Sequence, residues 1–545
     1  MKVYHFKNKI ILKGINIIYK PLLSLLLLNL LLFKPSNINN NKNADPYTNT
    51  NICNNISTNT KTNNKTNIKT DIKTNIKINE TSKVIQYKNQ TLKLFISSGK
   101  CLDLFPKTIY FNSKFRNYNE TKDIKIETIN LNENNKSYLV TYFMRHMRNY
   151  YNYFEVLNSN GLIEIPYENY SHNLFINTRN FSKLRNKVII NEYQKVYSFL
   201  NTYAFHHKDI LYENYLAMKK LFKDDYNYMP ETYCYPRDKN QIIIKFNNYT
   251  LDLNNLWLIK PVDKSVGFGI HFLYSLNKEI KNQKHFLITK FISKLDLIDN
   301  KKYDLRLYVL ITGLKPLRIY FYKKGLVRKA TSAFNISMMG VNNRYMYLTN
   351  TGVNVKSKDY IFPNKSDDVK ANIWNLDTYK NYLKSKNVDF DAIFEKIKDL
   401  TIKSIISFQN QLLIINKYLN ERNFYIILGI DILITDKFEP ILLEINNKPS
   451  LGIGDKVDEP IKTNLFADSM NIVGISLFSR EKHYNKLKRN NIEDSVNNAL
   501  CELYRPRGDY ELIFPLNENI EKYKKFFIKN NQENVLFWEK IKLTK

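Results

Sequence analysis

The acidic residues with the clearest chemical pattern lie in residues 429–450, GIDILITDKFEPILLEINNKPS. The segment reads as two apolar strands that a four-residue loop at 436–439 joins as a hairpin. Counting back from that loop places Asp431 directly opposite Glu444, and the alternation of side chains puts both on one face with Asn446. The isoleucines of the two strands form the other, apolar face.

Two carboxylates about 4 Å apart repel each other by roughly 4 kcal/mol at an effective dielectric constant near 20, so a cation is expected between them. Carboxylate and amide oxygens suit Mg²⁺, which usually keeps waters and substrate phosphates as its other ligands. The pattern therefore predicts a magnesium site at Asp431, Glu444 and Asn446. The alternative is structural, with Glu444 as a paired acid and Asp431 as an edge residue.

A lysine followed by a glycine-containing loop forms a second candidate site, in residues 257–271, WLIKPVDKSVGFGIH. We expect one strand to carry Lys260 and a loop containing Gly267 and Gly269 to return the chain into a second strand. Backbone amides in such a loop approach phosphate closely, and a nearby lysine adds a positive charge. A simple hairpin turn is the alternative for this loop.

Arginines inside an apolar strand mark a third candidate site, in residues 303–328, YDLRLYVLITGLKPLRIYFYKKGLVR. Asp304 and Arg306 share one strand face, and Arg318 and Arg328 lie on the following hairpin. An arginine among apolar neighbours pairs with a carboxylate or a phosphate, because its unpaired burial is prohibitive. A structural contact between Asp304 and Arg306 is the alternative.

The elements that position these residues follow from the spacing of apolar side chains. Residues 251–350 are rich in strands, residues 376–419 are helical, and a helix at 461–479 follows the hairpin. Strands flanking helices, with antiparallel hairpins, predict an α+β enzyme core. The predicted segments are a basic and apolar segment (1–35), an Asn/Lys/Thr-rich segment (36–83), an N-terminal and central α/β region (84–250), a catalytic domain (251–479) and a basic extension (480–545).

The N-terminal part of the chain is predicted to lack a fold of its own. Residues 36–83 are polar and of low complexity, so they bury too little apolar surface to order and should be disordered. Lysines precede an apolar run at 22–33, which resembles a signal peptide or an anchor but is short for a membrane span of about 20 residues. Contact with a membrane through residues 15–33 therefore stays open.

A net charge of +32 indicates an acidic partner, which is either nucleic acid or an acidic protein surface. The chain has no RNP-like run and no zinc-finger spacing, and its charge is spread out, so a nucleic-acid binder ranks last among the candidates. The four cysteines, Cys53, Cys101, Cys234 and Cys501, are far apart, and reduced structural thiols are expected.

At this point five segments in order resemble the tubulin tyrosine ligase-like family of ATP-grasp ligases, and most of all its polyglutamylases. They are KPVDKSVGFGI, KYDLRLYVLITGLKPLRIYFYKKGLVR, YLTNTGVN, GIDILITDKFEPILLEINNKPS and RPRGDYELIFPL. The resemblance runs from about residue 201 to residue 525. It implies an ATP-grasp fold, with ATP and Mg²⁺ as cofactors.

The resemblance also implies roles for matching positions. Arg306 would face the γ-phosphate or the acceptor, Arg328 would bind the incoming amino acid, and Glu444 would complete the catalytic set within the metal trio. The residues implied to contact ATP are Lys260, Val266, Gly267, Gly269, Thr289, Lys290, Phe291, Ile292, Lys302, Asp304, Thr349 and Asn350.

The implied activity is addition of glutamate to glutamate side chains of tubulin tails through an acylphosphate, in the cytoplasm and on microtubules. Tyr347, Thr289 and Ile373 depart from the family pattern, and glutamate-adding members carry a lysine where this chain has Ile373. The alternatives are a glycine or tyrosine ligase acting on tubulin or another acidic protein, and a microtubule-binding protein with a decayed ligase site.

Overall fold

The computed structural model describes residues 90–95, 101, 107–116, 126–131, 138–145, 150–165, 172–177, 193–199, 202–415, 421–478, 491–528 and 531–543. The predictions for segments 1–35 and 36–83, for membrane contact at 15–33 and for Cys53 lie outside these residues. Within the described part of the chain, no helix is both long and apolar enough to span a bilayer.

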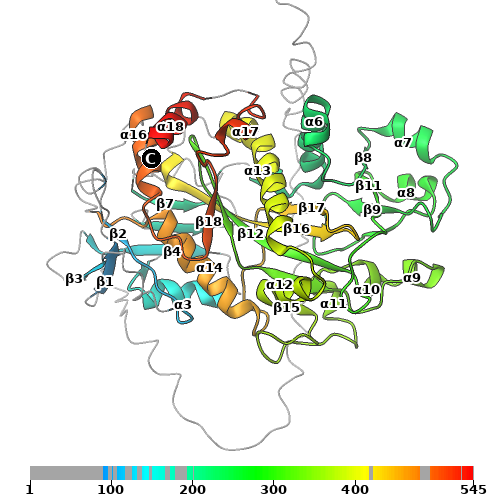
Figure 1. Ribbon diagram of the computed structural model, residues 1–545, viewed down its shortest axis with the longest axis horizontal. Helices are drawn as coiled ribbons and strands as arrows, with labels where there is room; N and C mark the ends of the chain where they lie inside the picture. Colours follow the sequence, from blue (N-terminus) through cyan, green and yellow to red (C-terminus); the bar gives the residue numbers. More distant parts are fainter. Residues whose placement is uncertain are drawn as a thin grey trace, which may run out of the picture. The chain divides into compact units, whose positions relative to one another are not determined.

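An 11-stranded sheet is the centre of the described fold (Figure 1). Its central pair is β12 (Tyr303–Leu314) and β16 (Phe424–Ile434), two long antiparallel strands that are buried along almost their whole length. The strands on the β12 side pair antiparallel, whereas β7, β6, β4 and β5 continue the sheet in parallel from β16. The remaining strands are β4 (Thr141–Arg145), β5 (Ile163–Glu164), β6 (Leu174–Asn177), β7 (Lys195–Tyr197), β13 (Leu317–Tyr322), β14 (Leu326–Lys329), β15 (Ile373–Asn375), β17 (Pro440–Asn446) and β18 (Tyr510–Phe514).

A second sheet of four strands, in the order β10-β9-β11-β8, carries the lysine and the glycine loop. One face packs on α7 and α8 through an apolar cluster that includes Trp257 and Phe286, and Figure 1 shows this unit beside the end of β17. β8 precedes residue 251 in the chain but pairs with β11, so this sheet draws on both sides of the expected domain boundary. The strands are β8 (Thr232–Tyr235), β9 (Trp257–Pro261), β10 (His271–Phe272) and β11 (Phe286–Lys290).

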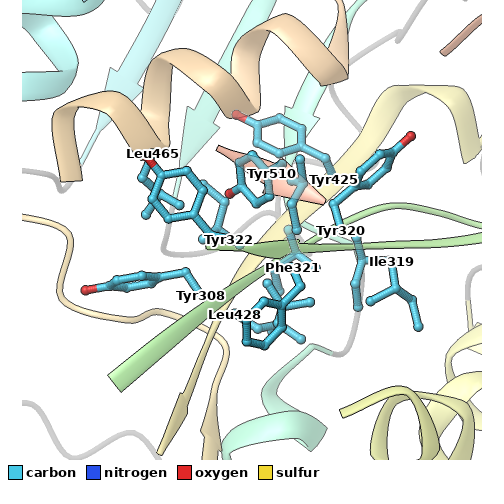
Figure 2. Packing of buried hydrophobic residues seen from close by; sticks show 14 of the residues in the cluster. Tyr308, Ile319, Tyr320, Phe321, Tyr322, Tyr425, Leu428, Leu465 and Tyr510 are labelled. Carbon is cyan, nitrogen blue, oxygen red and sulfur yellow. The ribbon is translucent and has the colours of Figure 1, made fainter. Parts of the chain in front are cut away.

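Helices cover the two faces of the central sheet. On one face α13 (Phe390–Ile415) lies against β13, where the rings of Phe394 and Phe321 are 6.3 Å apart. On the other face lies α14 (Asp458–Val473), and Figure 2 shows its Leu465 beside Tyr322. The other helices are α3 (Tyr151–Ser159), α5 (Tyr203–His206), α6 (Lys208–Phe222), α7 (Lys239–Phe246), α8 (Leu276–Asn282), α9 (Met338–Asn342), α10 (Arg344–Tyr347), α11 (Thr351–Asn354), α12 (Leu376–Ser385), α16 (Ile492–Glu502), α17 (Ile520–Lys524) and α18 (Gln532–Leu543).

The predicted α+β class is confirmed, and some element boundaries differ from the prediction. The helical segment expected at 376–419 is two helices, α12 and α13, and the helix expected at 461–479 begins at Asp458 and ends at Val473. The divisions of the chain at residues 84, 251 and 480 stay predictions.

Arg318 does not belong to the candidate site, because it is buried in a structural ion pair. Its Nε donates to Glu502 of α16 at 2.8 Å, and Tyr320 donates to the same carboxylate at 2.9 Å. The pair connects β13 to α16. Removal of either partner would leave an uncompensated buried charge and destabilise this contact.

The expectation of reduced thiols is wrong for Cys101 and Cys501, which form a disulfide with a Cα–Cα distance of 5.6 Å. Their sequence separation of 400 residues gave no sign that they would meet. Cys501 lies in α16, and Cys101 lies between β1 (Gln90–Phe95) and β2 (Thr108–Ile109), which form a small sheet with β3 (Ile126–Leu131). Cys234 is a buried free thiol, as predicted.

A reductant should lower the midpoint of thermal unfolding by several degrees, because a disulfide that closes a long loop stabilises a fold by about 2–5 kcal/mol. Differential scanning fluorimetry with and without dithiothreitol measures this change. Cys501→Ser should abolish the response, and Cys234→Ser should keep it. A wild-type midpoint that ignores the reductant would contradict a stabilising disulfide.

Candidate active site

The hairpin of β16 and β17 pairs Asp431 with Glu444, as the sequence predicted, although by a different route. The connecting loop is one residue longer than predicted, because Ile434 rather than Thr435 stands opposite Pro440. β17 has one extra residue opposite the step from Asp431 to Ile432 in β16, as in a β-bulge. This extra residue restores the predicted pairing. The two carboxylates therefore meet because two irregularities offset each other.

Two guanidinium groups hold Asp431 from the β12 side. Arg306 stands directly opposite it and donates from Nη2 at 3.0 Å, and Arg328 of β14 lies 2.9 Å from the same carboxylate. Burial alone would raise the pKa of Asp431, but the charges of the two arginines hold it well below its ordinary value. Arg328 also donates from Nε to Asp304 at 2.8 Å, so Asp304 pairs with Arg328 and not, as the structural alternative had it, with Arg306.

Glu444 is the carboxylate of the site that has room for a cation. Asn446 donates to its Oε1 at 3.1 Å, and no described residue forms an ion pair with it. Burial and then the negative charge of Asp431 raise the pKa of Glu444 above its ordinary value. A donor set of two facing carboxylates and an amide, with one carboxylate unpaired, fits Mg²⁺.

The predicted metal ligands combine two carboxylates with an amide. Among the described residues, no group of three or more His, Cys, Asp or Glu side chains is arranged to hold a metal ion. The third predicted ligand, Asn446, is an amide, so the trio has only two ligands of those four types.

Two lysines lie near the acids of the site, one from each sheet. Lys260 of β9 and Lys302, just before β12, are both desolvated, and burial lowers the pKa of each to about 8. The charge of Glu444 opposes this shift at Lys260, and the charge of Asp304 opposes it at Lys302. Lys302 donates to the backbone carbonyl of Tyr347 at 2.8 Å, which fixes its position. The site therefore holds two ammonium groups that a multiply charged anion would stabilise.

The glycine loop has the backbone geometry that the sequence indicated. Val266, Gly267 and Gly269 have φ of 56°, 74° and 73°, so three residues adopt the left-handed region within a short loop. A Cβ on Gly267 would come within 2.8 Å of the Asn350 side chain. The loop thus abuts the start of α11, where Thr349 is buried and Asn350 is half-buried.

The segment 289–292, which the resemblance implies to contact ATP, is divided between the two faces of its sheet. Thr289 of β11 and Phe291, just after the strand, are buried, and alternation places both on the face opposite to the α7–α8 packing. Lys290 points the other way, with its Nζ 5.0 Å from the centre of the Trp257 ring. Ile292 is half-buried just after the strand. Lys290 can therefore contribute only its backbone to a nucleotide on the Lys260 side.

Sequence reasoning missed four polar residues that surround this cluster. Lys208 begins α6 and donates to the carbonyl of Lys264 in the glycine loop at 2.7 Å. Tyr308 follows Arg306 on the same face of β12, and Asp458 and Lys462 begin α14 as an ion pair of 2.7 Å. The period-2 pattern would have found Tyr308, but the others come from separate helices that no local pattern links to the hairpin.

Comparison with known proteins places this geometry in context. The model of the tubulin-tyrosine ligase family matches residues 185–483. The chain is 31% identical over 295 residues to the Mus musculus protein named tubulin monoglutamylase TTLL4, covering 54% of this chain and 24% of that protein. It is 33% identical over 293 residues to the Homo sapiens protein named tubulin polyglutamylase TTLL5 (52% and 22%), and 30% identical over 368 residues to the Mus musculus protein named tubulin polyglutamylase TTLL6 (62% and 43%). The chain thus spans less than half the length of each of these relatives.

Binding of ATP should be accompanied by proton uptake near pH 8, because phosphate charge raises the lowered pKa values of Lys260 and Lys302. Below pH 8 both lysines are already charged, so affinity should be high there and fall as the pH rises above 8. Calorimetry in two buffers of different ionisation enthalpy measures the uptake. Lys260→Met should remove part of the proton uptake. An uptake of zero in the wild type at pH 8 would contradict contact of these lysines with the phosphates of ATP.

Proposed function

Since the chain belongs to the tubulin-tyrosine ligase family, we propose that it is an ATP-dependent ligase that adds glutamate to glutamate side chains of tubulin C-terminal tails. The relatives described above are named as tubulin glutamylases, which supports glutamate as the added amino acid and tubulin as the acceptor. One observation carries the proposal: two facing carboxylates, two buried arginines and two desolvated lysines converge at one place.

The proposed reaction has two steps. The acceptor carboxylate attacks the γ-phosphorus of ATP, which forms an acylphosphate and releases ADP. The amine of the free amino acid then attacks the acyl carbon, forms the amide and displaces phosphate, with loss of a proton from nitrogen. A carboxylate is a poor electrophile, so ATP supplies the leaving group that the amide bond requires.

The side chains of this site act by placement and by neutralising charge. We assign Lys260 and Lys302 to the phosphates of ATP, with the loop at Gly267 contributing backbone amides. Arg306 faces the γ-phosphate or the acceptor carboxylate, and Arg328 faces the incoming amino acid. No nucleophilic side chain is required.

Asp431, Glu444 and Asn446 are the proposed ligands of Mg²⁺, which when bound neutralises phosphate charge. Asp431 already pairs with two guanidinium groups, so Glu444 has the greater capacity to bind the ion. Asn446 orients Glu444 through its hydrogen bond.

Glycine is the alternative amino acid that one observation favours. Ile373 of β15 stands directly opposite Arg328 and is buried, so an apolar side chain occupies the place beside the proposed amino-acid ligand. The resemblance assigns a lysine to that position in glutamate-adding members. A decayed site is not favoured, because the carboxylates, lysines and arginines of the cluster are all present.

The proposed partners are microtubules, whose acidic tails complement a chain of net charge +32. This partner places the protein with the cytoskeleton in the cytoplasm. The Cys101–Cys501 disulfide is the observation that opposes this location, because disulfides are rare in cytosolic proteins.

Incubation with microtubules, ATP and Mg²⁺ should incorporate radiolabelled glutamate into tubulin. Glu444→Gln should reduce the rate by about 100-fold or more, because loss of the carboxylate weakens neutralisation of the phosphates. Glu439→Gln is the matched control, since Glu439 lies on the same hairpin but is exposed and pairs with Lys396.

The labels distinguish the competing assignments. Incorporation of glycine or tyrosine but not glutamate would keep the ligase and change the amino acid. Retained binding to microtubules with neither label nor ADP formation would contradict the ligase and support a decayed site.

A further inference from the structure

The catalytic face of β12 continues beyond the arginine to a buried tyrosine. Asp304, Arg306 and Tyr308 alternate along one face, and Asp304 and Arg306 have ion-pair partners. The hydroxyl of Tyr308 is buried and has no hydrogen-bond partner among the described residues. Figure 2 shows Tyr308 at the edge of the apolar cluster that it shares with Tyr320, Tyr322 and Tyr510, with its hydroxyl pointing away from their rings.

A second unpartnered oxygen lies at the start of α14, the helix that packs against β12 on this face. Asp458 is 6% exposed. Its Oδ2 accepts from Lys462 Nζ at 2.7 Å and from the Gly454 amide at 3.1 Å, but its Oδ1 has no partner among the described residues. Lys462 is held in turn by the Gly452 carbonyl at 2.9 Å. The carboxylate is therefore fixed in place with one oxygen unused.

The two oxygens share a buried electrostatic environment with the arginines of the site. Burial raises the pKa of Tyr308 above its ordinary value, Arg306 opposes the shift and the charge of Asp458 adds to it. Arg306 likewise helps to lower the pKa of Lys462, after burial. Tyr308 thus stays a neutral hydroxyl. A buried polar atom without a partner is costly, so two of them beside the proposed reaction centre require an explanation.

We propose that Tyr308 and Asp458 bind the ammonium group of the incoming amino acid. The proposal rests on the proposed ligase function and adds the subsite for the second substrate. An ammonium donates three hydrogen bonds, and a carboxylate oxygen and a phenolic oxygen both accept them. Lys462 and Arg328 supply the positive charge that the α-carboxylate of the same amino acid needs.

The subsite pairs a negative group with a positive one, whereas the Lys260 side is mainly cationic. Asp458 attracts an ammonium group, and the cations on the Lys260 side attract the phosphates of ATP. The ammonium group and the α-carboxylate of an amino acid carry opposite charges. They match the two members of the Asp458–Lys462 ion pair, which come from one turn of α14. The amino acid therefore enters from the α14 side and the nucleotide from the side of the four-stranded sheet.

Hydroxylamine measures formation of the acylphosphate independently of amino-acid binding. It traps an acylphosphate as a hydroxamate but lacks the α-carboxylate and side chain of an amino acid. In the full-length enzyme with ATP, Mg²⁺ and tubulin, Tyr308→Phe should raise the KM for glutamate about 10-fold, and Asp458→Asn about 10- to 100-fold. Hydroxamate formation and ATP affinity should stay within about twofold of the wild type.

Tyr425→Phe is the matched control, because its hydroxyl is equally buried and also lacks a partner among the described residues. It should leave the KM for glutamate unchanged. Unchanged KM values in both test variants, or a fall in hydroxamate parallel to ligation, would overturn the subsite. Absence of hydroxamate in the wild type would overturn the ligase itself, and the subsite with it.

Discussion

The centre of the fold depends on pairing the charges that β12, β14 and β16 bury. β12 and β16 are buried along both faces, and an isolated ion in such a place costs several kcal/mol even after relaxation. Asp304, Arg306, Arg328 and Asp431 meet this cost together, since each guanidinium and each carboxylate has an opposite charge within ion-pair distance. The opposite face of the same strands is apolar and carries α13. The network thereby fixes the register of three strands and presents its charges to one side only.

Local sequence patterns predicted the strands but not the loop length and the bulge that set their register. Alternation placed Asp431 and Asn446 correctly because side chains in a strand must alternate, whereas the loop length was wrong by one residue and a bulge offset the error. A bulge depends on the backbone of both strands, so one strand's sequence does not reveal it. The family resemblance predicted a nucleotide loop, but the sheet pairing was needed to show which face of the sheet carries Thr289 and which carries Lys290.

The contacts between residues of distant segments could not be predicted from the sequence, for a different reason. Asp458 looks like an ordinary first-turn acid of a helix, and Lys208 like an ordinary exposed lysine. Their relation to Arg306 and Glu444 exists only after α14 and α6 have packed on the sheets. Cys101 and Cys501 illustrate the same limit, since their pairing depends on the path of the whole chain between them.

The charge of the assembled site supports the proposal that it binds an anion. The cationic side chains outnumber the carboxylates, and burial lowers the pKa of Lys260 and Lys302 to about 8. In the proposed reaction, the phosphates of ATP would offset the excess positive charge and raise the pKa of both lysines. Glutamate, with two carboxylates and one ammonium group, would add one further negative charge. The cationic side chains counted are Lys208, Lys260, Lys302, Arg306, Arg328 and Lys462, and the carboxylates are Asp304, Asp431, Glu444, Asp455 and Asp458.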